Sequence, residues 1–206
     1  MKAILFDLGN VVIYLDEQQS YREFARLGGI SVEEVLEKAK TAPFFHAYER
    51  GLIHSGEFRT GIRDLLACES LSDQEIDQAW NAMLIRIDPK LLDVLLEIKR
   101  KYSIMVLSNT NVIHEQAFHE MLAEVSSYSH LNELFDHVYL SQEIHQRKPD
   151  AAAWQLILAE HPGIQPDEVL FLDDRLENLE AAKSLGIQVK QIHHPGETLD
   201  LLQKII

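Results

Sequence analysis

Residues 3–10 read Ala-Ile-Leu-Phe-Asp-Leu-Gly-Asn, an apolar run that ends in a carboxylate and is followed by a Gly-Asn pair. Unbroken apolarity over so few residues predicts a strand buried on both faces, which is typical of parallel sheets packed between helices. Four later runs share this character, and they lie at Ile104–Leu107, Val138–Leu140, Val169–Leu172 and Ile187–Val189. The first run and the next three end in polar residues, so polar side chains are expected to gather at strand ends.

Helical patterns separate the later strands. The stretch Leu91–Lys101 places Leu91, Leu92, Leu95 and Ile98 on one face, and Ala151–Glu160 is a second helical pattern. Strands that alternate with helices predict the α/β class. We therefore expect a Rossmann-like, doubly wound parallel sheet with its functional residues at the carboxyl ends of the strands.

The segment between the first strand and residue 86 differs from the rest. It shows amphipathic helical stretches around residues 16–27, 32–40, 56–67 and 73–85, and no convincing strand. Ser31 with Glu34 and Ser72 with Glu75 have the spacing of capping boxes that open two of these helices. We predict a small all-helical cap domain at residues 15–86, inserted after the first strand into an α/β core domain of residues 1–14 and 87–206.

The composition excludes several kinds of partner. The formal net charge of −14 disfavours nucleic acid and anionic membranes as ligands. The single cysteine, Cys68, excludes an intrachain disulfide and a cysteine-rich zinc site. The N-terminal apolar run is too short for a signal peptide, and no stretch approaches the roughly 20 apolar residues of a membrane span. We expect a cytoplasmic protein, monomeric or homodimeric, that binds neither nucleic acid nor membrane.

Four polar clusters carry the candidate chemistry. In chain order they are Asp7-Leu8-Gly9-Asn10, Ser108-Asn109-Thr110, Lys148-Pro149 and Asp173-Asp174. Each has an ordinary explanation when taken alone: helix caps for the aspartates, a turn for Ser108-Asn109 and a solvated loop for Lys148. Their occurrence together in one α/β chain favours a shared site over coincidence.

These clusters resemble, in order, the four motifs of the haloacid dehalogenase-like (HAD) superfamily. Phe6–Val12 is similar to the first motif, Leu107–Thr110 to the second, Arg147–Pro149 to the third, and Phe171–Asp174 with Asn178 to the fourth. Within the superfamily, the Asp-Leu-Gly-Asn-Val opening resembles small bacterial sugar-phosphate phosphatases of the α-D-glucose-1-phosphate phosphatase type. The predicted helical insert resembles their cap domain, including its Tyr48–Gly51 stretch.

The resemblance implies a magnesium-dependent phosphatase with an aspartyl-phosphate intermediate. Asp7 would be the nucleophile, and Mg²⁺ would be held by Asp7, the Gly9 carbonyl, Asp173 and Asp174, since this ion prefers hard oxygen ligands. Ser108, Asn109 and Lys148 would bind the phosphoryl oxygens, with Ser108 and Lys148 also counted as catalytic. A metal and a lysine would make the site locally positive in an acidic protein. The implied substrate is a small phosphorylated metabolite, such as glucose 1-phosphate.

One position departs from the family pattern. Most phosphatases of the superfamily have a second aspartate two residues after the nucleophile, which acts as general acid and base, whereas this chain has Gly9. Such help is typically worth 10²–10⁴-fold, so its loss is best tolerated with a good leaving group. Asp16, His46, Tyr48 and Glu49 are candidate replacements, each with a plainer structural explanation.

Two other functions remain open on the sequence. The chain is either a phosphatase or a catalytically weak protein that binds a phosphorylated metabolite for regulation, because Gly9 removes the usual acid. A 2-haloacid dehalogenase is a third reading, although the Asp173-Asp174 pair disfavours it. Four further residues, His114, His119, Trp80 and Trp154, are interpreted as ordinary helix or packing residues, although the start of the helix with His114 is in a position to face the predicted site.

Overall fold

A five-stranded parallel sheet forms the centre of the protein, for which a computed structural model describes residues 1–206. The strand order is β5-β4-β1-β6-β7, with every neighbouring pair parallel. The strands are β1 (Ala3–Phe6), β4 (Ser103–Ser108), β5 (His137–Leu140), β6 (Val169–Asp173) and β7 (Gln188–Gln191). All five predicted strands are confirmed, and β1 lies in the middle, so the chain winds outward from it in both directions.

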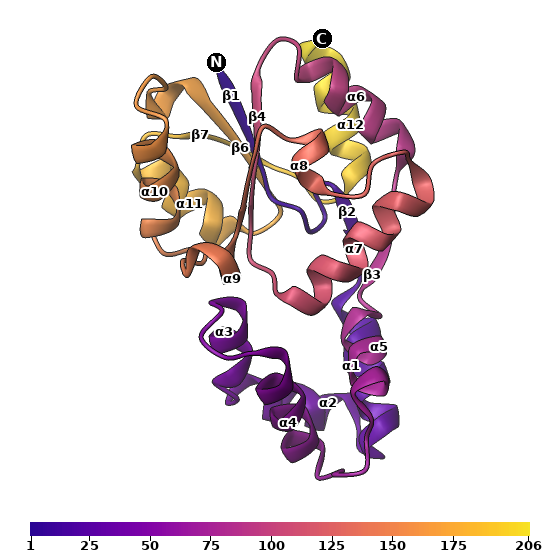
Figure 1. Ribbon diagram of the computed structural model, residues 1–206. Helices are drawn as coiled ribbons and strands as arrows, with labels where there is room; N and C mark the ends of the chain where they lie inside the picture. The colour runs from indigo at the N-terminus through magenta and orange to yellow at the C-terminus, as the bar shows by residue number, and fades with distance from the viewer.

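Helices cover both faces of this sheet (Figure 1). One face carries α6 (Pro89–Ile98), α7 (Val112–Val125), α8 (Leu131–Leu134) and α12 (Pro195–Ile205). The other carries α10 (Ala152–Glu160) and α11 (Leu176–Ser184), with the short α9 (Ser141–Ile144) and the 3₁₀ turn Pro166–Glu168 between strands. The side chains of β1 alternate between two cores: Ile4 and Phe6 pack in one, Ala3 and Leu5 in the other. The predicted doubly wound α/β fold is therefore confirmed.

A bundle of five helices lies beyond the carboxyl ends of the strands (Figure 1). Its helices are α1 (Glu17–Gly28), α2 (Val32–Lys40), α3 (Phe44–Glu49), α4 (Ser55–Leu66) and α5 (Asp73–Asn81). It has an apolar core of its own, centred on Phe24, Phe58 and Ile76. The Ser72 capping box is present with both of its hydrogen bonds, whereas the Ser31 side chain accepts only the Glu34 N–H.

Two details of this region differ from the sequence prediction. The last predicted helix stops at Asn81, and Leu84–Ile87 forms strand β3, which pairs antiparallel with β2 (Ile13–Leu15). Helical periodicity continues through this stretch, but pairing with β2 outweighs that local preference because it joins the two strands that lead into and out of the bundle. The short helix α3 was not predicted, because six residues after Pro43 carry too little pattern to be recognised.

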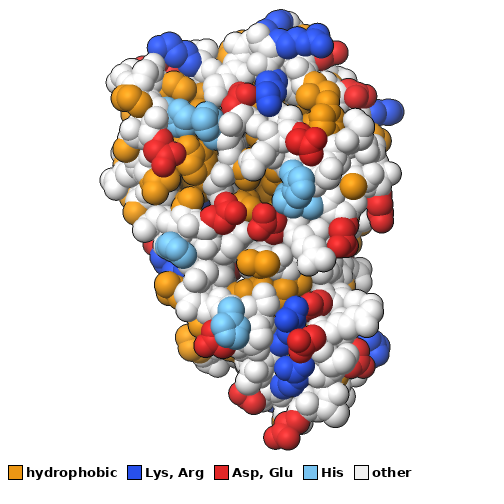
Figure 2. Space-filling model, in the orientation of Figure 1, with side chains coloured by type: hydrophobic (Ala, Val, Ile, Leu, Met, Phe, Trp, Pro, Cys, Tyr) orange, Lys and Arg blue, Asp and Glu red, His pale blue; other side chains and the backbone are white.

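On the face of the molecule shown in Figure 2, the charged side chains are not gathered into a single region. Figure 2 shows acidic side chains spread over both the sheet part and the helical bundle, with lysines and arginines between them. No helix has the length and apolar character required to cross a membrane. The local charge of the functional site must therefore be read from its own residues.

Candidate active site

Three carboxylates meet at the carboxyl edge of the sheet. Asp7 follows β1, Asp173 ends β6 and Asp174 comes directly after it. Because β1 and β6 are parallel neighbours, their ends lie at one edge. Carboxylate oxygens of the three residues lie within 4.8 Å of one another. The structure thus brings together the three side chains that the sequence analysis had assigned to a metal.

A buried lysine lies between two of these carboxylates. The Nζ atom of Lys148 is 2.9 Å from Asp7 Oδ1 and 2.7 Å from Asp173 Oδ2, and the lysine side chain is only 1% exposed. Burial alone would lower the pKa of Lys148, but the charges of Asp7 and Asp173 outweigh it and raise this pKa above its usual value. Lys148 is therefore a fixed positive charge in the middle of the cluster.

One lysine faces three carboxylates in this cluster, so their charges do not balance. Burial raises the pKa of Asp7 to about 7, Lys148 opposes the rise, and the charges of Asp173 and Asp174 add to it. The excess of buried negative charge fits a divalent cation with hard oxygen ligands, which would favour the ionised carboxylates. The donor set therefore fits magnesium.

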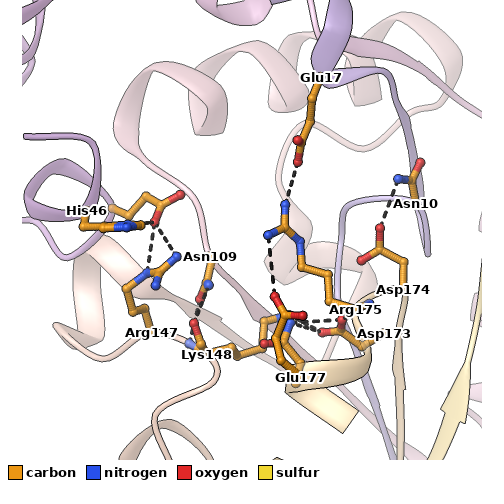
Figure 3. Close-up of polar contacts among 12 residues, drawn as sticks. Asn10, Glu17, His46, Asn109, Arg147, Lys148, Asp173, Asp174, Arg175 and Glu177 are labelled. Carbon is orange, nitrogen blue, oxygen red and sulfur yellow. Dashed lines mark hydrogen bonds and ion pairs between the residues drawn. The ribbon is translucent and has the colours of Figure 1, made fainter. Parts of the chain in front are cut away.

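The two aspartates at the end of β6 differ in their surroundings. Asp173 is fully buried and accepts hydrogen bonds from the Asn178 amide at 3.0 Å and from the Arg175 backbone N–H at 2.8 Å, besides its contact with Lys148. Asp174 is partly exposed, and its Oδ2 accepts one hydrogen bond from the Asn10 amide at 3.1 Å (Figure 3). Asp173 is thus occupied in holding protein groups, and Asp174 is the more available ligand.

Asn109 has a contact that the sequence analysis did not predict. Its Nδ2 donates to the Lys148 carbonyl and its Oδ1 accepts the Lys148 backbone N–H, both at 2.8 Å (Figure 3). Lys148 comes from the loop between α9 and α10, so these bonds attach that loop to the end of β4. These bonds hold Lys148 in place, and the role of Asn109 as a ligand of the phosphoryl oxygens stays a prediction. The neighbouring Ser108 is buried and lines a cavity over the carboxylate cluster.

Gly9 is closely packed rather than open. A Cβ atom built on Gly9 would lie 2.6 Å from Leu15 Cδ1, so any side chain here requires Leu15 to move. Leu15 thus occupies the space next to the position where most of the superfamily carries its second aspartate. The departure seen in the sequence therefore coincides with close packing of Leu15 against Gly9 at the entry to the helical bundle.

A cavity of about 480 Å³ lies over the carboxylate cluster, between the sheet and the helical bundle. Asp7, Gly9, Lys148 and Asp174 are among the residues of its floor. Its roof is formed by bundle side chains, which include Glu17, Tyr21, His46, Glu49 and Trp80. A wider groove of about 740 Å³ between α4, α5 and α7 contains none of the three carboxylates, so the smaller cavity is the candidate active site.

The four candidates for the replacement acid differ in whether they line this cavity. His46 and Glu49 line it. Asp16 is outside it and caps α1, where its Oδ1 accepts the Gln18 N–H. The Tyr48 side chain is buried in the bundle, with its hydroxyl 2.8 Å from Ser55 Oγ. Geometry therefore leaves His46 and Glu49 as the two candidates able to face a substrate.

Two ion pairs join bundle residues of the cavity lining to arginines of the sheet part, and Figure 3 shows the pair of Arg175 with Glu17. The Arg147 guanidinium donates to Glu49 Oε2 from Nε at 3.0 Å, and its second contact with this oxygen is 2.9 Å long. The Arg175 guanidinium contacts Glu17 Oε1 at 2.6 Å. Neither arginine was predicted as a site residue in its own right, although Arg147 opens the third motif and Arg175 directly follows Asp174 of the fourth.

The junction of bundle and sheet also holds a buried histidine. The His114 ring stacks on Trp80, with centroids 4.6 Å apart, and its Nδ1 lies 2.8 Å from Asn81 Oδ1. Burial lowers the pKa of His114 to about 3, so its ring is neutral near pH 7. Both rings line the cavity. Trp80 is thus a packing residue, as expected, and it also lines the cavity. Trp154 is buried in the core beside the sheet.

The fold and this site define a hydrolase. The model of the haloacid dehalogenase-like hydrolase family matches residues 1–186, and the chain belongs to that family. It is 31% identical over 193 residues to D-ribitol-5-phosphate phosphatase from Bacteroides thetaiotaomicron, covering 93% of this chain and 91% of that protein.

Solved structures give the same result. A HAD family enzyme from Bacteroides thetaiotaomicron, crystallised with magnesium and inorganic phosphate, superposes with a TM-score of 0.83 at 34% identity over 93% of each chain. A predicted HAD-like hydrolase from Porphyromonas gingivalis superposes with a TM-score of 0.87 at 27% identity, covering 100% of this chain and 97% of that one.

Proposed function

We propose that the protein is a magnesium-dependent phosphatase that hydrolyses a small phosphorylated metabolite through an aspartyl-phosphate on Asp7. The observation that carries this proposal is the contact of Lys148 Nζ with Asp7 and Asp173, inside a group of three carboxylates. Carboxylates alone suit a metal, whereas a metal site with a buried lysine also suits a phosphate dianion. The similarity to a polyol-phosphate phosphatase supports the same reaction.

Asp7, Asp174 and the Gly9 carbonyl would hold the magnesium ion. Asp173 has its oxygens engaged by Lys148, Asn178 and the Arg175 N–H, so we assign it mainly to positioning these groups. When bound, magnesium neutralises charge on the phosphoryl oxygens and on Asp7. We also propose that residues 15–86 act as a cap domain over a core of residues 1–14 and 87–206.

The reaction would proceed in two displacements at phosphorus. An Asp7 carboxylate oxygen attacks the phosphorus atom, and the bond from phosphorus to the alcohol oxygen breaks with its electron pair remaining on that oxygen. A water molecule then attacks the phosphorus of the aspartyl-phosphate, the bond to Asp7 breaks, and inorganic phosphate leaves as the carboxylate is restored. Lys148 stays protonated throughout and donates to the phosphoryl oxygens, as does Ser108.

The departing alcohol oxygen needs a proton, which the usual second aspartate would supply. Gly9 supplies none, and the Leu15 side chain fills the adjacent space. Water or a roof residue must therefore deliver the proton, and His46 and Glu49 are placed in the cavity wall. A substrate with a good leaving group depends least on this proton, which favours a sugar 1-phosphate over a simple alkyl phosphate.

The roof suggests a polyhydroxylated leaving group. Glu17, Glu49, His46 and Tyr21 offer donors and acceptors in the cavity, and burial together with the Glu17 charge raises the pKa of Tyr21, so its hydroxyl keeps its proton. Both arginines of the cavity are already paired with glutamates, which lowers the attraction for a second anionic group on the substrate. We therefore propose a sugar monophosphate, with a 1-phosphate preferred, as the substrate class.

The test is phosphate release from a panel of substrates, with magnesium and with a chelator. The panel contains glucose 1-phosphate, ribitol 5-phosphate, p-nitrophenyl phosphate and acetyl phosphate. We expect magnesium-dependent release that falls by about a thousandfold or more in Asp7→Asn, as on removal of a covalent nucleophile. The matched control is Asp16→Asn, which keeps a good helix cap outside the cavity and should retain activity.

Other outcomes select the alternatives. Tight binding of sugar phosphates without phosphate release would favour a regulatory binding protein, the alternative raised by the absence of the usual acid at Gly9. Halide release from a 2-haloacid without magnesium would favour a dehalogenase. Release that persists in Asp7→Asn would contradict the assignment of the nucleophile.

A further inference from the structure

Asn10 has a backbone conformation that few residues adopt. Its φ angle is +53°, in the left-handed region, where glycine is the easiest residue and asparagine one of the more tolerated ones. It lies in the turn that leads from β1 to β2, and its backbone N–H donates to the Ile13 carbonyl at 2.8 Å. Glycine would adopt this backbone conformation equally well. The backbone alone therefore does not explain the asparagine, whereas the contacts of its side chain do.

The Asn10 side chain makes two hydrogen bonds in opposite directions. Its Nδ2 donates to Asp174 Oδ2 at 3.1 Å, and its Oδ1 accepts the Leu15 backbone N–H, also at 3.1 Å. Figure 3 shows the amide facing the Asp174 carboxylate. Leu15 is the last residue of β2, just before the bundle helix α1, and its side chain fills the space beside Gly9. One side chain thus joins a carboxylate of the cluster to the strand that enters the bundle.

These two bonds require an amide. Aspartate would keep the acceptor for Leu15 but would turn a second carboxylate toward Asp174, and like charges at this distance repel. Serine is too short to reach both partners. Asp174 has no other protein hydrogen bond to this oxygen, whereas Asp173 has three donors around its carboxylate. The orientation of Asp174 therefore depends on Asn10.

We infer that Asn10 is a positioning residue of the metal site: it orients Asp174 for magnesium and joins that carboxylate to the entry of the helical bundle. The inference rests on the proposed function, because it assigns Asp174 to the metal. Hydrogen-bond partners that orient a metal ligand commonly change metal affinity by 10- to 100-fold when removed. Asn10 touches no reacting atom in this scheme, so its effect acts through Asp174.

The experiment compares magnesium binding to wild-type protein and Asn10→Gly by titration calorimetry, without substrate. Glycine keeps the left-handed backbone and removes both side-chain bonds. We expect a Kd for magnesium that is 10- to 100-fold higher in Asn10→Gly, and a smaller rise in Tm on adding a fixed magnesium concentration. Saturating magnesium should restore most of kcat, which a general structural defect would not allow. Asn10→Ser, in which the amide donor is also absent, is the second variant and should behave alike.

The control is Ala67→Gly, which also introduces glycine at a left-handed position, φ +51°, but at the end of α4 and outside the cavity. Its magnesium Kd should equal that of the wild type. An unchanged Kd in both Asn10 variants, with wild-type binding intact, would overturn this inference and leave the proposed function standing. A wild-type protein that binds no magnesium would overturn both.

Discussion

The floor and the roof of the cavity are built in different ways. The floor, formed around Asp7, Lys148 and Asp173, is held by buried hydrogen bonds and ion pairs within the sheet part, and the Lys148 side chain is 1% exposed. The roof consists of partly exposed bundle side chains, and its links to the floor include the Glu49–Arg147 and Glu17–Arg175 pairs. Charges buried in this way have one low-energy arrangement, whereas partly hydrated pairs can exchange partners.

This difference indicates that the floor and the roof act on different parts of the substrate. A fixed array of charges suits the transfer of a phosphoryl group, which is the same for every substrate. Adaptable side chains suit the leaving group, which varies. Changes in the floor should therefore reduce turnover for all substrates, while changes in the roof should alter the ranking of substrates at little cost in stability.

The strongest test of the floor is Lys148→Met, which keeps the side-chain volume and removes the charge. Asp7 and Asp173 would then be buried without their partner, and loss of one member of a buried ion pair costs about 3–5 kcal/mol. We expect the free energy of unfolding without metal to fall by that amount, and phosphate release to fall by about a hundred- to a thousandfold for every substrate. Urea unfolding, with and without magnesium, and p-nitrophenyl phosphate hydrolysis measure the two effects.

Lys99→Met is the matched control for this variant. Lys99 is also paired with an aspartate, Asp136, at 3.4 Å, but both side chains are about a third exposed. Its loss should cost under about 1 kcal/mol and leave turnover unchanged. Equal losses of stability in the two lysine variants would contradict the contrast between a rigid floor and the rest of the molecule.

The sequence predicts the floor well because its residues lie at strand ends. Asp7, Ser108 and Asp173 each end or follow a buried run, and a parallel sheet brings the carboxyl ends of neighbouring strands to one edge. Lys148 is different, since it lies in a loop after α9, and its contact with Asp7 and Asp173 does not follow from a strand end. The two hydrogen bonds from Asn109 explain that placement physically.

The roof could not be predicted to the same extent. Whether Glu49 faces Arg147 depends on how a bundle packed around its own core is seated on the sheet, and no local pattern encodes that orientation. The β2–β3 pairing is a second example, because Leu84–Ile87 continues a helical periodicity and becomes a strand only when Ile13–Leu15 lies beside it. Tertiary contacts override local propensity at both places.

His114 lies where floor and roof meet, and it provides a test of intermediate size. The pKa of His114 in the folded state is about 3, below the ordinary value of 6.5. Between these two pH values the unfolded chain therefore binds a proton at His114 and the folded chain does not. Its contribution to stability is present above pH 6.5 and is lost as the pH falls from there toward 3. Between pH 7 and pH 5 we expect the wild type to lose about 2 kcal/mol more than His114→Gln.

Urea unfolding at several pH values checks this expectation. Glutamine retains a donor for Asn81 but does not titrate, so the carboxylates of the protein contribute alike to both profiles. Profiles that run parallel from pH 7 to pH 5 would show that protonated His114 is accommodated at the junction without cost.

The smallest expected effects come from the roof, and there the two ion pairs can be set against each other. Glu49→Gln removes the charge of a pair whose side chains are 24% and 19% exposed, and Glu17→Gln that of a pair whose side chains are about half exposed. Ion pairs of these kinds contribute about 0–1 kcal/mol, so neither variant should unfold the protein. Because Glu49 contacts Arg147 through two guanidinium nitrogens, its loss should free that arginine more completely. We expect KM for a sugar phosphate to change by up to about fivefold in Glu49→Gln and less in Glu17→Gln.

If Glu49 also supplies the proton that Gly9 cannot, kcat for the sugar phosphate should fall as well, while kcat for p-nitrophenyl phosphate, whose leaving group needs no proton, should stay the same. Equal falls in kcat for both substrates would place Glu49 with the floor and remove the distinction between the two regions.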